Sequence, residues 1–138
     1  MRSSENERGA AAVEFALMFP LVIMLLITIF EFSRLWNIQA TITSGAAVGA
    51  RYAAVHYEPD LDVAGIGTLE TKSEAESKKI PGFVDWTAAT VDVKATCATS
   101  GVATSEITVA PGSITQWFGT LLSADFDLKA TGAMPCNG

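Results

Sequence analysis

Groups that could perform catalysis are scarce in this sequence. It contains one histidine, His56, and two cysteines, Cys97 and Cys136, among 138 residues. A Ser-His-Asp or Cys-His arrangement would have to use His56, whose place between Val55 and Tyr57 favours a packing or surface role. The motifs H-E-x-x-H, C-x-x-C and G-x-G-x-x-G and the P-loop are also absent. The sequence therefore predicts a protein that is not an enzyme and has no metal or other cofactor.

Basic residues are also few. The chain has 9 lysines and arginines against 15 acids, a net charge of −6, and the excess lies after Tyr57, where 11 acids face 5 bases. Nucleic acid requires a basic face, so no nucleic-acid partner is expected. Asp60 and Asp62 lie in this acidic part, but the glycine and the distal glutamate of a calcium loop are missing.

Charge is absent altogether from residues 15–30. Counted from Ala10, this apolar run contains a single acid and would be about 31 Å long as a helix, which matches the roughly 30 Å hydrocarbon core of a bilayer. It is longer than the apolar part of a secretory signal and is followed by Glu31 and Arg34, which can pair, and not by a small-residue cleavage site. We therefore expect a retained transmembrane segment over residues 10–30, with Pro20 tolerated in its first half.

The residues before this segment set the expected orientation. Residues 1–9 are polar and of mixed charge, which indicates a leader or a disordered tail. The positive-inside rule favours a cytoplasmic N-terminus beside Arg2 and Arg8. The two cysteines agree with this, because an even count in an anchored protein indicates one Cys97–Cys136 disulfide in an oxidising compartment, with two unpaired buried thiols as the alternative.

Helical spacing continues beyond the membrane to Tyr57, and the helix should end before Glu58-Pro59. A run of small residues follows Ser44, and within it Gly45 and Gly49 form a G-x-x-x-G step that lets another backbone approach closely. That face could pack on the protein's own sheet or on neighbouring subunits. The sequence leaves both partners open.

For residues 58–138 the sequence predicts a small extracytoplasmic α+β domain. We expect a loop over 59–67, a charged, exposed helix over Leu69–Ile80, and a short core-covering helix over Ile114–Leu122. Three runs alternate apolar with polar residues, as strands with one buried face do. These runs are Val91–Ala95, Glu106–Ala110 and Phe126–Ala130. The expected fold is a three-stranded, mostly antiparallel sheet that lies on the upper part of the long helix.

The most specific pattern surrounds Gly9. The sequence Gly9-Ala10-Ala11-Ala12-Val13-Glu14-Phe15-Ala16, behind a short polar leader and ahead of an apolar helix, resembles a prepilin of the type IV pilus superfamily. Glutamate followed by an aromatic residue is similar to the tight-adherence (Tad, Flp-type) branch. The long helix and the sheet-bearing C-terminal part are similar to the TadE-like pseudopilins, or minor pilins, of that branch.

This resemblance implies a structural role in pilus assembly and surface adhesion. A membrane prepilin peptidase would cut between Gly9 and Ala10. Glu14 and Phe15 would then serve assembly, with the Glu14 carboxylate paired to the new Ala10 amine of its own chain or of the next subunit. The implied partners are the peptidase, other pilins and pseudopilins, the lipid bilayer and the inner-membrane assembly platform, before any extraction into an extracellular pilus.

A second interpretation is a single-pass envelope protein, anchored in the plasma membrane, whose outer domain binds a ligand or an envelope partner. Such a protein needs no cut after Gly9 and gives Glu14 no purpose. Glu14 would then lie at headgroup level, with its carboxylate reaching water.

Overall fold

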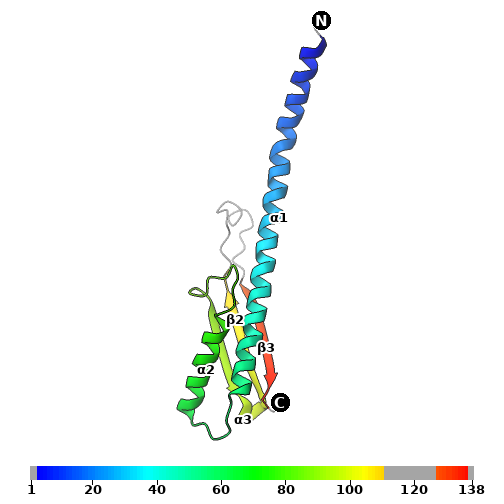
Figure 1. The fold of residues 1–138 in the computed structure, drawn as a ribbon. Helices are drawn as coiled ribbons and strands as arrows, with labels where there is room; N and C mark the ends of the chain where they lie inside the picture. The colour runs from blue at the N-terminus through cyan, green and yellow to red at the C-terminus, as the bar shows by residue number, and fades with distance from the viewer. Residues whose placement is uncertain (1–2, 111–126, 137–138) are drawn as a thin grey trace. The chain divides into compact units, whose positions relative to one another are not determined.

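A computed structural model describes residues 3–110 and 127–136, with side chains from residue 9 onward. The chain divides into two compact units, residues 1–34 and 35–138. One helix, α1 (Ser3–Val55), contains most of the first unit and the beginning of the second (Figure 1). The predicted fold class is confirmed: a long N-terminal apolar helix precedes a small domain with a three-stranded antiparallel sheet.

The first unit is the apolar part of α1. Among the described residues, α1 from Gly9 onward is the one helix long and apolar enough to cross a membrane. Its large apolar side chains are exposed within the structure, Phe15 to 66% and Leu17 to 74%, so they require an apolar surrounding. The helix continues through Pro20 without a break. It begins at Ser3, although the sequence predicted no regular structure for the leader. Extension of an existing helix is easier than its nucleation, so the polar residues before Gly9 can continue it.

In the second unit, residues 35–55 of α1 present one face to the core. The helix ends at Val55, two residues before the predicted end, and the His56 N–H still donates to the Tyr52 carbonyl at 3.1 Å. The buried residues of this face recur at steps of three and four. They are Ile38, Ile42, Ala46, Ala50, Ala53 and Ala54.

The prediction of a loop over 59–67 was wrong in part, because helix α2 (Val63–Ser77) begins at Val63. Asp62 is the N-cap of α2, and its Oδ1 accepts from the Gly65 N–H at 2.7 Å. This cap satisfies a free helical donor and starts the helix earlier than the charge pattern indicates. One face of α2 is also buried, through Leu69, Ser73 and Ser77, so the helix is not simply a solvated surface element.

The three strands are longer than the alternating runs that predicted them. They are β1 (Thr90–Thr96), β2 (Val102–Val109) and β3 (Leu128–Pro135), and the central strand β2 pairs antiparallel with each of the other two. The second strand begins four residues before Glu106, and the third continues past Ala130, because pairing with a neighbour extends a strand beyond its clear alternation. Phe126 and the helix predicted over 114–122 lie outside the described residues. A short helix, α3 (Cys97–Ser100), lies between β1 and β2.

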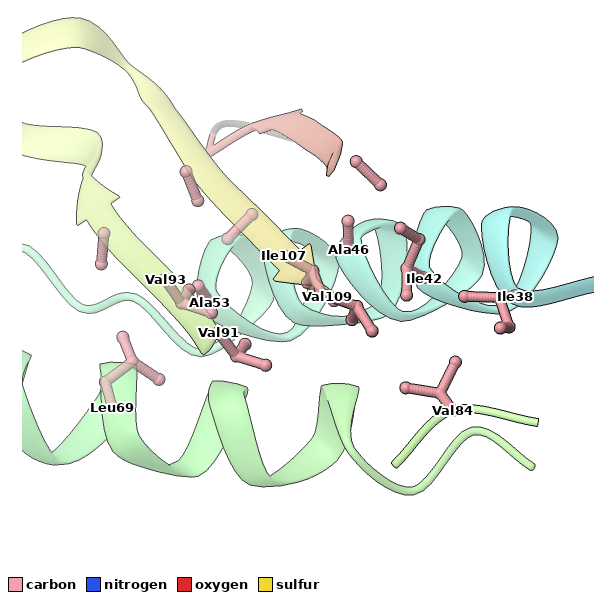
Figure 2. Close-up of a cluster of buried hydrophobic side chains, with 14 residues drawn as sticks. Ile38, Ile42, Ala46, Ala53, Leu69, Val84, Val91, Val93, Ile107 and Val109 are labelled. Carbon is pink, nitrogen blue, oxygen red and sulfur yellow. The ribbon is translucent and has the colours of Figure 1, made fainter. Parts of the chain in front are cut away.

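The core lies between the sheet and the two helices. Figure 2 shows its side chains gathered in one cluster, with Ile42 and Ala46 of α1 beside Ile107 and Val109 of β2. Leu69 of α2 belongs to the same cluster. The alternate residues of β1 are buried on this face and exposed on the other, as the period-two pattern predicted.

The segment between α2 and β1 closes one end of the core. The Trp86 indole N–H donates to the Ile80 carbonyl at 3.0 Å, and the ring reaches the backbone at Gly45. The Asp85 carboxylate accepts from the Thr87 hydroxyl at 2.6 Å and from the Thr87 N–H at 3.0 Å. These bonds stabilise the charged form and lower the pKa of Asp85.

Glycines on α1 allow the other elements to approach it closely. A methyl group at Gly49 would overlap the Ser77 hydroxyl of α2 and lie 3.0 Å from Ser105 Oγ of β2. A methyl at Gly45 would lie 3.1 Å from both Ile107 and the Ser77 carbonyl oxygen. The G-x-x-x-G face therefore packs inside the second unit, on its own sheet and on α2, which is one of the two partners that the sequence left open.

We predict that Gly49→Ala destabilises the isolated protein by about 1–2 kcal/mol. The added methyl must displace the Ser77 hydroxyl from its bond to the Ser73 carbonyl, and this overpacking exceeds the gain in helix propensity. Gly67→Ala is the matched control, because Gly67 lies in α2 with open space around it among the described residues. The control should be neutral or up to about 1 kcal/mol more stable. Urea unfolding of the full chain in detergent measures both, and equal effects would contradict the packing.

Candidate functional site

The residues around the predicted cleavage point lie on successive turns of α1. Gly9, Ala10, Glu14 and Phe15 are all exposed, and a methyl group added at Gly9 would meet nothing within 4 Å among the described residues. Ala10 and Glu14 are four positions apart, so they share one face of the helix, separated by about 6 Å of rise. The structure therefore brings together the residue that would bear the new amine and the carboxylate that would pair with it.

The surroundings of Glu14 are apolar. Val13 and Phe15 are exposed to 62% and 66%, and the Phe15 and Phe19 rings lie 5.4 Å apart. Glu14 is the only acid in residues 10–30. A carboxylate at the centre of a membrane costs about 2.5–3.5 kcal/mol and less near a helix end, so a nearby cation would offset a real cost.

A second charged pair lies where the apolar stretch ends. Arg34 and Glu31 form the i,i+3 ion pair that the sequence predicted, with 3.9 Å between Arg34 Nη1 and Glu31 Oε2. Glu31 is buried, with 7% of its surface exposed. Its charge is therefore compensated within one turn. The bases nearest to Glu14 in the sequence are Arg8, six positions before it, and Arg34, 20 positions after it, about 9 Å and about 30 Å along the helix.

The two cysteines form the predicted disulfide. Cys97 follows β1, Cys136 follows β3, and their Cα atoms are 5.6 Å apart. Val102, the first residue of the central strand, pairs with the last residue of each outer strand, so the bridge joins the two outer strands across the start of β2. It closes a span of 39 residues and contributes about 4 kcal/mol in the chain-entropy model.

Backbone hydrogen bonds hold the same end of the sheet. The Cys136 N–H donates to the Gly101 carbonyl at 2.9 Å, and the Gly101 N–H donates to the Cys97 carbonyl at 3.0 Å. Gly101 has φ of 70°, a left-handed conformation that favours glycine and ends α3.

His56 and Asp62, which the sequence offered as a possible catalytic residue and a possible calcium ligand, make contacts that stabilise the fold. The His56 ring stacks on Tyr52, with centroids 4.0 Å apart, and Asp62 caps α2. No cluster of three or more histidine, cysteine or acidic side chains suited to a metal occurs within residues 3–110 and 127–136. The sequence predictions did not include Gly132 as a packing residue, although a glycine within a strand often marks a close backbone approach. A methyl there would lie 2.5 Å from the Ala46 carbonyl oxygen of α1.

Together these features define a class of protein in which one N-terminal apolar helix, able to cross a membrane, carries a small disulfide-bonded α+β domain. The family model described as TadE-like protein matches residues 9–51. Residues 9–51 are therefore similar to TadE-like proteins, which is the resemblance that the Gly9 to Ala16 pattern predicted. The match begins at Gly9 and ends inside α1, so it covers none of the sheet. No curated protein and no solved structure matches the chain.

We predict that wild-type protein contains no free thiol. Alkylation under denaturing, non-reducing conditions, followed by intact mass measurement, should add no label, because both cysteines are joined. After reduction the same treatment should add two labels, which is the positive control. Two labels without reduction would show that the disulfide does not form.

Proposed function

We propose that this protein is a minor pilin or pseudopilin of a Tad-type pilus, with a structural role and no catalytic one. The observation that carries the proposal is the TadE-like match, which begins at Gly9 and includes Glu14. The protein would lie in the plasma membrane, with its N-terminus in the cytoplasm and the disulfide-bonded domain outside, until it joins a pilus that serves adhesion. Its partners would be the prepilin peptidase, the assembly platform and other pilins.

Cleavage after Gly9 would solve the electrostatic problem of Glu14. The new amine of Ala10 is positively charged at neutral pH. It is then the nearest cation along the helix, because Arg34 lies about 30 Å away. The pair can form within one chain, where one helical turn separates the groups, or between the amine of one subunit and Glu14 of the next. Pairing between subunits would set the register of assembly.

Processing requires a local change in the helix. The Gly9–Ala10 bond lies inside α1, whereas a peptidase must bind an extended backbone at the cut. Glycine favours this change, because it is about 1 kcal/mol less stable than alanine in a helix interior. The open space around Gly9 among the described residues also leaves room for an enzyme to approach the bond.

We predict that replacing Gly9 with leucine blocks processing and leaves the nine-residue leader on the membrane protein. Leucine stabilises the helix at the cut and adds a side chain where the enzyme must contact the backbone. Amino-terminal sequencing or intact mass of the protein recovered from cells measures this. Gly67→Leu, far along the chain, is the processing control. Wild-type protein that keeps residues 1–9 would instead support the membrane-anchored envelope protein.

We predict that Glu14→Gln is cleaved and inserted like wild type but crosslinks to its pilin partners at least about ten-fold less. An uncharged amide cannot pair with the Ala10 amine, and the loss of one ion pair in an apolar surrounding is worth at least one factor of ten. Glu14→Asp keeps the charge and should retain part of the crosslinking. Glu5→Gln is the matched control, because Glu5 leaves with the leader. Undiminished crosslinking and normal piliation in Glu14→Gln would exclude the pairing between subunits.

A further inference from the structure

Strand β3 is the least buried strand of the sheet. Its one buried apolar residue is Ala130, and the other residues on that face are only partly covered. Strand β1 buries Val91, Val93 and Ala95 on the same face. Apolar burial stabilises roughly in proportion to the area removed from water, so β3 gains less from the core than β1 does.

Strand β3 pairs with β2 alone and, among the described residues, lies against α1. The Gln39 side-chain amide of α1 donates to the Lys129 carbonyl at 3.2 Å, and Gly132 lies close to the Ala46 carbonyl of α1. Strand β1, in contrast, packs against α2, and the Ala95 N–H donates to Glu70 Oε1 at 3.0 Å. The two outer strands therefore pack on different helices, and β3 differs from β1 in burying one apolar residue instead of three.

The disulfide compensates for this difference. Cys136 directly follows β3, and its bond to Cys97 ties the end of the strand to the segment between β1 and β2. We propose that this disulfide is a redox latch on β3: its reduction by a dithiol releases β3 from the sheet, while residues 35–55 of α1, α2, β1 and β2 stay folded. Both cysteines are partly exposed, so a small dithiol can reach them.

Reduction of the bond proceeds by thiol–disulfide exchange. A thiolate of the dithiol attacks one sulfur of the Cys97–Cys136 bond and forms a mixed disulfide, which the second thiol resolves. The dithiol is oxidised to its cyclic disulfide, and its two electrons and two protons appear as the thiols of Cys97 and Cys136. Release of β3 uncovers the edge of β2 at Ala103, Ser105 and Ile107, the register partners of Met134, Gly132 and Ala130. An uncovered strand edge can accept another strand.

Amide hydrogen exchange of the full chain in detergent tests the latch. Oxidised protein is compared with protein held in dithiothreitol, with peptides from β1 and β3 followed by mass spectrometry. Protection in β3 should fall at least about thirty-fold, the lower end of what loss of a disulfide causes, while β1 changes less than about three-fold. A parallel fall in β1 and β3 would show global unfolding and overturn the proposal, as would unchanged protection in β3.

Two variants separate the latch from effects of the reagent. Cys97→Ser with Cys136→Ser should reproduce the exposed β3 without dithiothreitol, and addition of the dithiol should then change nothing further. Gln39→Ala, with the disulfide intact, should keep the protection of β3 within about three-fold of wild type, because one exposed hydrogen bond is worth little. Release of β3 in this variant would show that the disulfide is not what holds the strand.

Discussion

The close approach of α1 to its neighbours constrains everything else in the second unit. Helix and sheet meet where side chains are missing, at Gly45 and Gly49 on the helix and at Gly132 on β3. Because protein interiors are packed at the density of organic crystals, a methyl group at any of these places forces another atom to move. The small core thus depends on the absence of atoms at particular positions as much as on the apolar side chains themselves.

The same helix meets two different demands along its length. Before residue 34 its apolar side chains are exposed, which only an apolar surrounding such as a bilayer makes favourable. After residue 35 its apolar side chains are buried against the domain, first Ile38 and Ile42 and then the smaller Ala46, Ala50 and Ala53. The TadE-like match runs from Gly9 to residue 51 and so includes residues of both parts.

Glu14 and the disulfide illustrate two ways of treating a local weakness. A carboxylate in an apolar segment is costly, and a charge created beside it can offset the cost. An edge strand with one buried residue is weakly held, and a covalent bond at its end limits its opening. The disulfide is formed by an oxidation, and under the proposed function a proteolytic cut would supply the cation that Glu14 lacks.

Much of this protein was determined by patterns that act locally. The uncharged run, the Gly9 to Ala16 sequence, the i,i+3 pair at Glu31 and the alternation in β1 each depend on neighbours within a few residues, so the sequence predicted them. The disulfide was predicted on other grounds, from the even cysteine count and the expected membrane anchor, because Cys97 and Cys136 are 39 residues apart. Helix α2 was misplaced at its start because one side-chain cap, Asp62, outweighs the weak pattern behind it.

Only the tertiary structure decided which surfaces meet. The G-x-x-x-G step states that something approaches closely, but α2, β1 and β2 became its partners through contacts between residues far apart in the chain. The full length of β2 and β3 likewise depends on pairing across the sheet, and the importance of Gly132 appears only when the Ala46 carbonyl lies against it. A small-residue pattern shows that some surface can pack closely on the helix, but it does not show which one. Contacts between residues far apart in the chain decide that when the protein folds.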